Sequence, residues 1–407
     1  MWRESGDGGE PTRRAYLKYG GAVVTSGLLA GCTGGTDSGS TADPTGTAAG
    51  TPSEAETSTA TAESVTETRT ATAEPESEPY TVSMAPVGEV TFDAVPETWV
   101  ANNGSWADMG VALGLEPPKA VWLTSRYHTQ YYDSIPGVSV DRSDMVSLYQ
   151  DGVSKELFYE LDGDVHVMDP HFLMNRFGGW KESDIDEIDE NVGPFFGNCI
   201  YAQHYPWHED YRYYTLYEGF EKLAHVFQRR ERYAAFESIH DEFQQNLAPV
   251  VPGQGERPSV AVLWGVGDGP EKFYPYIIGE GTGFKHLRDL GVRDTLASTD
   301  IRDFHGSRAA IDIETLLEVD PEVLMLRGYE SKSAETFRNT VVEFLRNHAT
   351  ASELTAVRNG DVYRAGGLYQ GPITNLVLTE RTAGQLYDAD EELFDRQRVA
   401  DVVAGEL

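Results

Sequence analysis

The segment that decides the fold spans residues 213–247 and reads YYTLYEGFEKLAHVFQRRERYAAFESIHDEFQQNL. Apolar side chains recur in it, largely at spacings of three and four, with charged residues between them: Leu216, Phe220, Leu223, Phe227, Phe236, Ile239, Phe243 and Leu247. This periodicity predicts one helix of about 30 residues, roughly 45–50 Å long at 1.5 Å per residue. A stretch rich in Pro and Gly, residues 249–258, follows it.

Short apolar runs alternate with helical patterns on both sides of this segment. Strands are predicted before it at residues 98–101, 120–123 and 165–168, and after it at 259–264, 322–326 and 361–364. Helices are predicted among them at residues 106–113, 311–319 and 374–387. Such alternation predicts α/β layering with mainly parallel sheets. We therefore expect two Rossmann-like α/β lobes, residues 80–212 and 249–407, joined by one long helix at residues 213–248.

The chain is strongly acidic, with a formal net charge of −34 from 66 acidic and 32 basic residues. This charge excludes nucleic acid as a natural partner, because binding phosphates requires the opposite sign. The acidic residues are spread from end to end, which favours a surface adapted to molar salt and with it a halophilic archaeon. An acidic patch for a cationic ligand or partner is the alternative.

The first 32 residues have the pattern of an export signal. Arg13 and Arg14 precede an apolar stretch from Gly20 to Ala30, which is shorter than the roughly 20 residues that a membrane-spanning helix needs. The paired arginines are typical of the pathway that exports folded proteins. The sequence LAGC at residues 29–32 resembles a lipobox, so we expect Cys32 to carry lipid and to anchor the protein outside the cytoplasm.

Residues 33–79 are dominated by Thr, Ser, Ala, Gly, Glu and Pro. This composition predicts a disordered tether, whose Thr/Ser density suits O-glycosylation and whose length holds a globular part off the membrane. The second cysteine, Cys199, has no intramolecular disulfide partner once Cys32 carries lipid, and we expect it to be buried as packing.

Aromatic and cationic residues gather at the ends of the predicted strands and in the loops after them. The candidates for ligand contact are Arg126, Tyr127, His128, Trp264, Tyr274, Arg327, Tyr329 and Tyr369. Ligands of parallel α/β sheets bind beyond the carboxyl ends of the strands, which places the expected site between the lobes. Flat rings and forked guanidinium donors suit an anionic, planar or catecholate-type chelate. The alternative is that many of these rings only pack helices onto the sheets.

Histidines offer a weaker indication of a metal site. His204 and His208 are four residues apart, but Pro206 between them argues against a helix that would align them. Together with His128 and His171 they would form a direct metal site, whereas solvated or packing histidines are the interpretation we favour, and no metal ligand is predicted. Asn103 begins an Asn-Gly-Ser sequon, which is either a glycosylation site or a position beside the ligand.

Several stretches together resemble one family. Residues 106–115, WADMGVALGL, resemble a first helix that ends in a Leu-Gly turn. Residues 316–326, LLEVDPEVLML, are similar to its pattern of a helix, an Asp-Pro turn and a strand, and residues 356–363, AVRNGDVY, resemble its near-terminal turn and strand. Residues 164–169, DVHVMD, match a strand of the first lobe without the usual Asp-Pro turn. The arrangement resembles the helical-backbone class of ABC-transporter solute-binding proteins, which handle iron-siderophores, cobalamin and haem.

This resemblance implies an extracytoplasmic lipoprotein without catalytic activity. It would capture an iron-siderophore, cobalamin or haem-like chelate between two lobes and deliver it to a membrane permease and its ATPase. It implies no cofactor other than that ligand. A receptor for a bare divalent metal is the first alternative, a secreted hydrolase the second, and a surface adhesion protein the third.

Overall fold

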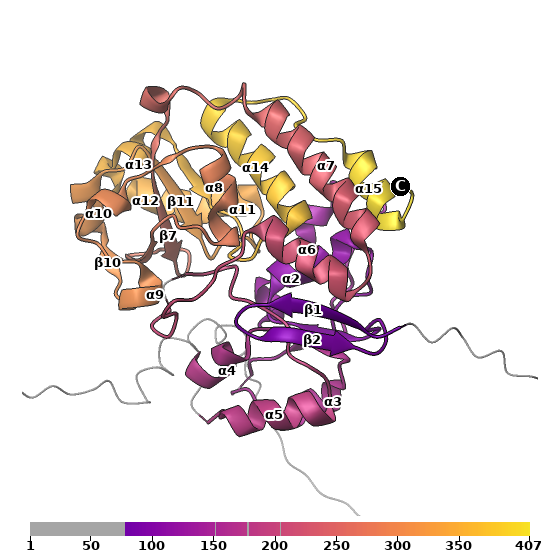
Figure 1. Ribbon diagram of the computed structural model, residues 1–407. Coiled ribbons are helices and arrows are strands. Elements are labelled where there is room, and N and C mark those ends of the chain that lie inside the picture. The colour runs from indigo at the N-terminus through magenta and orange to yellow at the C-terminus, as the bar shows by residue number, and fades with distance from the viewer. Residues whose placement is uncertain (1–77, 151, 177–178, 204) are drawn as a thin grey trace, which may run out of the picture. The chain divides into compact units, whose positions relative to one another are not determined.

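The structure is a computed structural model that describes residues 78–150, 152–176, 179–203 and 205–407 (Figure 1). These residues belong to one compact unit, Glu76–Leu407. The paired arginines, Cys32 and nearly all of the predicted tether lie outside the described residues. None of the described helices combines the length and apolar character that crossing a membrane requires.

The first half of this unit contains a parallel sheet of four strands in the order β5-β4-β3-β6. The strands are β3 (Trp99–Ala101), β4 (Ala120–Val121), β5 (Val146–Ser147) and β6 (Val165–Val167). The helices of this half are α2 (Gly104–Ala112), α3 (Lys155–Leu161), α4 (Pro170–Arg176) and α5 (Glu182–Asn191). An antiparallel hairpin, β1 (Tyr80–Met84) and β2 (Gly88–Phe92), precedes the sheet. The three strands predicted before residue 213 are confirmed, and the hairpin was not predicted.

The second sheet has the order β10-β8-β7-β11-β12, with β9 also paired to β7. Its strands are β7 (Ser259–Gly265), β8 (Lys272–Tyr276), β9 (Arg293–Asp294), β10 (Ile311–Asp312), β11 (Val323–Arg327) and β12 (Val362–Arg364). Strands β7, β9, β11 and β12 are parallel, whereas β8 runs antiparallel to both β7 and β10. The prediction of an α/β fold with mainly parallel sheets is therefore confirmed.

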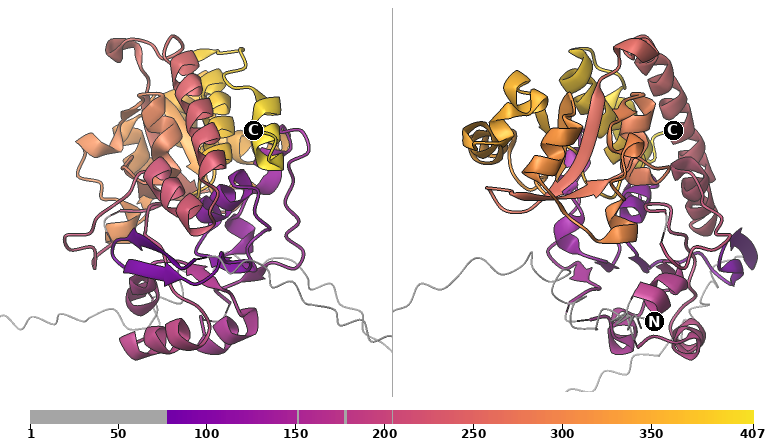
Figure 2. Two further views of the ribbon diagram at one scale, coloured as in Figure 1. Left: turned by 45° about the vertical axis from the view of Figure 1, so that its right-hand side comes forward. Right: turned by 90° about the vertical axis from the view of Figure 1, so that its left-hand side faces the viewer.

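Helices follow most strands of the second half, and two further helices, α14 and α15, end the chain. They are α8 (Lys285–Asp289), α9 (Phe304–Ser307), α10 (Ile313–Val319), α11 (Ala334–Phe337), α12 (Glu343–Asn347), α13 (Thr355–Asn359), α14 (Pro372–Tyr387) and α15 (Arg396–Ala404). Helix α14 begins with Pro at its first position, where the missing N–H is not needed. Figure 2 shows α14 and α15 beside α7, in agreement with their residue contacts.

The predicted single helix at residues 213–248 is wrong, because the segment forms two helices, α6 (Leu216–Val226) and α7 (Arg230–Leu247). Between them Gln228 adopts the left-handed conformation, with φ of 51°. The helices then pack against each other in opposite directions, with ring centroids 4.2 Å apart for Tyr217 and His240 and 5.9 Å apart for Phe220 and Phe236. The apolar stripe is interrupted by five polar residues at 228–232, so this turn has no apolar face to bury.

One hydrophobic core joins early and late parts of the chain. It includes Trp106 of α2, Phe220 of α6, Phe236 of α7, Ile373 of α14 and Val399 of α15, all nearly inaccessible to solvent. The C-terminal helices therefore pack on elements of the first half. The predicted lobe boundaries at residues 80–212, 213–248 and 249–407 stay a prediction.

Candidate functional site

The loops that leave the carboxyl ends of the two sheets meet each other. We call this region the loop interface: residues 123–132 after β4, Trp264 at the end of β7, residues 327–333 from the last residue of β11 onward, and residues 365–371 after β12. Tyr131 Oη donates to Glu330 Oε2 at 2.7 Å, and Gln130 Nε2 donates to the Glu330 carbonyl at 2.9 Å. Nearby, the Arg126 guanidinium lies 5.2 Å from the ring centroid of Trp264, at the end of β7. Both sheets thus supply polar and aromatic side chains to one region, as the strand-end argument predicts.

Glu330 is the most heavily bonded side chain of the loop interface. It is 3% exposed, and both of its carboxylate oxygens accept from Arg381 of α14, each at 3.1 Å. Its Oε1 also accepts from the Gly366 N–H at 2.9 Å. Burial alone raises the pKa of a carboxyl, but the charge and hydrogen bonds of Arg381 and the hydrogen bond of Tyr131 outweigh it and lower the pKa of Glu330 to about 2. Glu330 therefore stays ionised as a fixed link between the two sets of loops.

Arg327 is a buried cation at the end of β11. It is 1% exposed, and its Nη2 donates to the Gly283 carbonyl at 2.6 Å. Its guanidinium lies 4.3 Å from the Phe284 ring centroid and 5.2 Å from that of Tyr276, as expected for cation–π contact. Burial lowers the pKa of Arg327 to about 10, so the side chain is still protonated at neutral pH. It gives this end of the sheet a positive charge, and no carboxylate among the described residues is hydrogen-bonded to it.

The other predicted site residues divide by burial. Arg126, His128, Trp264, Tyr274 and Tyr369 are half-buried, whereas Tyr127 and Tyr329 are 2% exposed. The Tyr127 hydroxyl is hydrogen-bonded to that of Tyr132 at 2.9 Å, and Tyr329 Oη donates to the Gly267 carbonyl at 2.9 Å. The hydroxyls of these two tyrosines are therefore bonded within the protein.

The half-buried residues do not all lie together. His128 packs on Tyr131 with 6.5 Å between ring centroids, within the loop interface. Tyr369 packs edge-on against Tyr201 at 5.6 Å, whereas Tyr274 of β8 packs against Phe304 at 4.9 Å. The ligand role of all eight predicted residues stays a prediction.

An open depression of about 550 Å³ adjoins the loop interface and is lined by Thr124, Ser125, Thr129, Val140, Arg142 and Ser143. Arg142 Nη1 donates to the Thr124 carbonyl at 2.8 Å, which fixes its guanidinium beside the depression. A second depression of about 300 Å³ includes Pro258 and Val323, at the amino ends of β7 and β11. Only the first adjoins the predicted ligand residues, so it is the better candidate for a place where ligand enters.

Asn103 is not available as a glycosylation site on the folded chain. It is 1% exposed, and its Oδ1 accepts from the Ser105 N–H at 2.8 Å as the N-cap of α2. Its Nδ2 donates to Asn102 Oδ1 at 2.6 Å. A capping side chain of this kind satisfies a helix N–H that has no partner inside the helix, which explains the residue without a glycan or a ligand.

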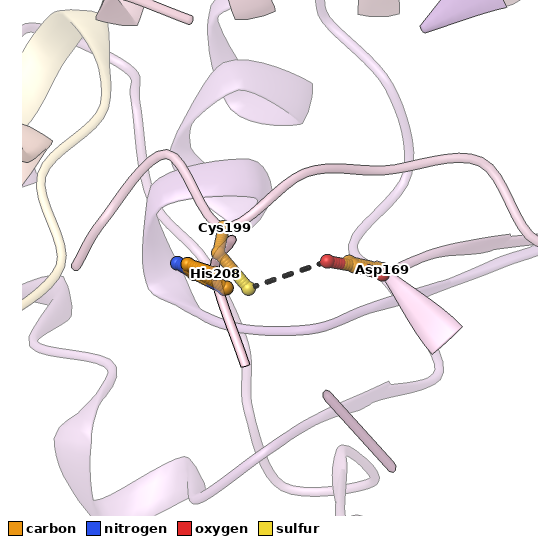
Figure 3. Close-up of side chains that lie close together, drawn as sticks. All are labelled: Asp169, Cys199 and His208. Atoms are coloured by element: carbon orange, nitrogen blue, oxygen red, sulfur yellow. Dashed lines mark hydrogen bonds between the residues drawn. The ribbon is translucent and has the colours of Figure 1, made fainter. Parts of the chain in front are cut away.

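A second group of polar residues escaped the sequence analysis. Asp169, two residues after the end of β6, lies with Cys199 and His208, and one potential ligand atom from each residue falls within 4.8 Å of the others (Figure 3). Cys199 is 1% exposed, which confirms the expectation that it is buried. The sequence paired His208 with His204 instead, and His204 lies outside the described residues. Asp169 and Cys199 are 30 residues apart, so no local spacing reveals the group.

The comparisons with known proteins agree with this fold. Residues 184–367 match the model of a family described as periplasmic binding protein. A search of curated proteins finds no match.

Solved structures of binding proteins resemble the chain over most of its length. A periplasmic solute binding protein from Mycobacterium smegmatis has a TM-score of 0.51 at 15% identity, over 76% of this chain and 97% of that one. The siderophore binding protein BauB, bound to a complex of two acinetobactin molecules and ferric iron, has a TM-score of 0.51 at 16% identity, over 76% and 99%. The iron uptake ABC transporter substrate-binding protein PiuA from Streptococcus pneumoniae has a TM-score of 0.50 at 15% identity, over 75% and 97%.

At these identities the solved structures establish the fold, while the family match comes from the sequence of residues 184–367. The family consists of binding proteins and not of enzymes, which argues against the secreted hydrolase. Residues 184–367 are thus similar to the periplasmic binding protein family, and the described unit shares its fold with solved binding proteins.

Proposed function

We propose that the chain is the substrate-binding component of an ABC importer and that it captures a ferric siderophore or a related iron chelate at the loop interface. The observation that carries this proposal is the contact of Arg126 with Trp264, which brings a cation and a large flat ring together from the two sheets. Ferric chelates of the catecholate type are anionic and planar in part, and these two groups suit both properties. The fold shared with a solved siderophore-binding protein supports the same ligand class.

The closed arrangement of the loops suggests how ligand is held. Contacts that cross the loop interface include Tyr131 with Glu330, Gln130 with Glu330, the Gly367 N–H with Tyr131 Oη, and Arg126 with Trp264. We expect ligand to displace the contact of Arg126 with Trp264, because both side chains are only half-buried. The buried Glu330 contacts would remain and keep the two sets of loops in register. Ligand affinity would then depend on a small local opening beside the depression at Thr124 and Ser125.

The N-terminal sequence supports a proposed location outside the cytoplasm. Arg13, Arg14 and Cys32 support export in a folded state and a lipid anchor at Cys32, and residues 33–79 would hold the binding unit above the membrane. The partners would be a permease and an ATPase. The net charge of −34 supports a protein that works in molar salt, as in a halophilic archaeon. Cobalamin and haem remain alternative ligands, because they too offer planar or anionic surfaces to rings and guanidinium groups.

The test is a tryptophan-fluorescence titration of the full chain in molar salt. Catecholate and hydroxamate ferric siderophores, cobalamin and haemin would be titrated separately, each with its metal-free form as control. A ferric siderophore should quench the wild type, and Trp264→Phe should remove most of that quench. Trp180→Phe is the matched control, since Trp180 packs on Phe158 away from the loop interface and should leave the quench unchanged. If only cobalamin or haemin quenches saturably, that compound and not a ferric siderophore is the ligand.

A further inference from the structure

Asp169, Cys199 and His208 bring three different metal-binding groups together outside the loop interface (Figure 3). Cys199 Sγ lies 3.7 Å from Asp169 Oδ2, and a nitrogen of His208 lies within 4.8 Å of both ligand atoms. Asp169 and Cys199 are 2% and 1% exposed, whereas His208 is half-buried. The group is thus closed on the side of the carboxylate and the thiol, and His208 forms its more accessible side.

The spacing of sulfur and oxygen fits a tetrahedral ion. An ion of the zinc type sits about 2.3 Å from a thiolate sulfur and about 2.1 Å from a carboxylate oxygen, which places these two atoms about 3.6 Å apart. The observed separation of 3.7 Å between Cys199 Sγ and Asp169 Oδ2 needs almost no movement to accept such an ion. A simple packing cysteine requires no carboxylate at this position.

Each of the three groups is also oriented by neighbouring hydrogen bonds. Tyr211 Oη donates to Asp169 Oδ2 at 2.6 Å and accepts from the Cys199 N–H at 2.8 Å, so one hydroxyl positions two of the groups. His171 Nδ1 lies 2.9 Å from Asp169 Oδ1. The Tyr213 hydroxyl lies 2.6 Å from His208 Nδ1. Metal ligands in proteins are commonly held by an outer layer of hydrogen bonds of this kind, which fixes the ring and carboxylate orientations.

We propose that Asp169, Cys199 and His208 bind one divalent ion of the zinc class, with water in the fourth position. A thiolate and an imidazole select this class over magnesium or calcium, which prefer oxygen ligands. Cys199 binds as the thiolate and gives its proton to solvent, and no electron is transferred. Three protein ligands and one open position make the site distinct from the chelated iron that we propose as cargo at the loop interface.

The ion would stabilise the segment that forms one side of the binding region. It ties the segment that contains Cys199 and His208 to the end of β6. From this segment Tyr201 packs on Tyr369 at 5.6 Å, and Tyr205 packs on His305 at 5.7 Å. Gly281 lies against the same segment so closely that a Cβ there would be 2.5 Å from the Tyr201 carbonyl oxygen. Metal binding should therefore stabilise contacts between the two halves of the unit.

Cobalt spectroscopy tests this assignment. The full chain with Cys32→Ser, which leaves Cys199 as the only thiol, would be treated with a chelator and titrated with Co²⁺. A near-ultraviolet sulfur-to-cobalt charge-transfer band at one equivalent is expected, and Zn²⁺ should abolish it by displacement. Adding Cys199→Ser should remove the band. His208→Gln should weaken Zn²⁺ binding at least tenfold, whereas His225→Gln on α6 is the matched control and should leave it unchanged.

The assignment is overturned if no band appears, or if His208→Gln binds Zn²⁺ as tightly as His225→Gln does. Thermal unfolding of each variant without metal would show whether it folds, so that a lost band is not mistaken for a lost structure. Titration of the Cys199→Ser variant with ferric siderophore reports separately on the proposed cargo. Siderophore binding without a zinc site refutes this inference alone, and a zinc site without siderophore binding refutes only the proposed cargo.

Discussion

Replacing Glu330 with glutamine removes the negative charge of the ion pair that connects the loop interface to α14. Arg381 then keeps its positive charge in a mostly buried position, with its side chain 23% exposed. Breaking a buried ion pair by removal of one partner costs about 3–5 kcal/mol, because the remaining charge stays desolvated without compensation. The pKa of Glu330 leads to a similar magnitude: its lowering from 4.5 to about 2 corresponds to about 3 kcal/mol.

The sign of the pH dependence follows from the direction of this shift. The pKa of Glu330 is lower in the folded chain than in the unfolded chain, so the ion pair stabilises the fold fully above pH 4.5. That contribution is lost progressively as the pH falls from 4.5 towards 2. The difference in unfolding free energy between wild type and Glu330→Gln should therefore be about 3 kcal/mol at pH 7 and should shrink as the pH falls below 4.5.

Denaturant unfolding in molar salt measures this difference. The matched control is Glu322→Gln, whose carboxylate pairs with Arg293 at 3.0 Å on the surface, with both side chains more than half exposed. An exposed pair contributes about 0–1 kcal/mol and is screened by salt. If Glu330→Gln costs no more than Glu322→Gln at pH 7, or if its cost does not change between pH 5 and pH 3, the buried link is not what holds the loops together.

Three further predictions concern other parts of the molecule. Burial raises the pKa of Asp108 from 3.8 to about 6. The protonated carboxyl therefore stabilises the folded state below pH 3.8, and this contribution of about 3 kcal/mol is lost as the pH rises to 6. Asp108→Asn should remove this pH dependence in denaturant titrations, and an unchanged profile would contradict it. Arg126→Gln should weaken binding of an anionic ferric chelate about tenfold in calorimetry, with the melting temperature unaltered; equal affinities would place the ligand elsewhere. Tyr213→Phe should weaken Zn²⁺ binding by about 10–100-fold in a competition assay, and a smaller change would exclude Tyr213 as a support of His208.

The sequence predicted the strands well because each is a short, buried apolar run. Val323 to Leu326 and Val260 to Leu263 are fully or almost fully buried in the centre of the second sheet, and continuous apolar runs of this kind are typical of strands covered on both faces. The antiparallel strand β8 was harder to predict, because its sequence, KFYPY, carries a proline and reads as a loop. Tyr274 was therefore expected in a loop, although it lies in a strand opposite Trp264.

The prediction of one long helix was wrong because it rested on the spacing of the apolar residues and overlooked the polar segment that interrupts them. Leu216 to Phe227 and Phe236 to Leu247 each have a good helical period, but residues 228–232 are polar and allow the chain to reverse at Gln228. In the reversed arrangement Phe220 packs on Phe236, which a straight helix would keep apart. The packing of α6 on α7 therefore outweighs the local preference of the segment for one continuous helix.

The sequence could place candidate site residues only where they lie at or near strand ends, and their ligand role stays a prediction. Trp264 and Arg327 lie at the ends of β7 and β11, and Arg126 lies in the loop after β4, so all three are found where the sheets end. The pair of Glu330 and Arg381 was missed because Arg381 lies on α14, and only the folded chain brings this helix to the loops. The group of Asp169, Cys199 and His208 was missed for the same reason, since only folding brings Cys199 to the end of β6.

The measurement that tests the central claim most directly is calorimetric titration of the full chain in molar salt with a ferric siderophore and with its iron-free form. The account predicts saturable one-to-one binding of the ferric form, and at a free concentration of about 100 times the dissociation constant it predicts stabilisation of about 2.7 kcal/mol. Glu330→Gln should reduce this affinity, while Glu322→Gln should not. Absence of binding by catecholate and hydroxamate ferric chelates alike would contradict the claim that this protein captures iron chelates.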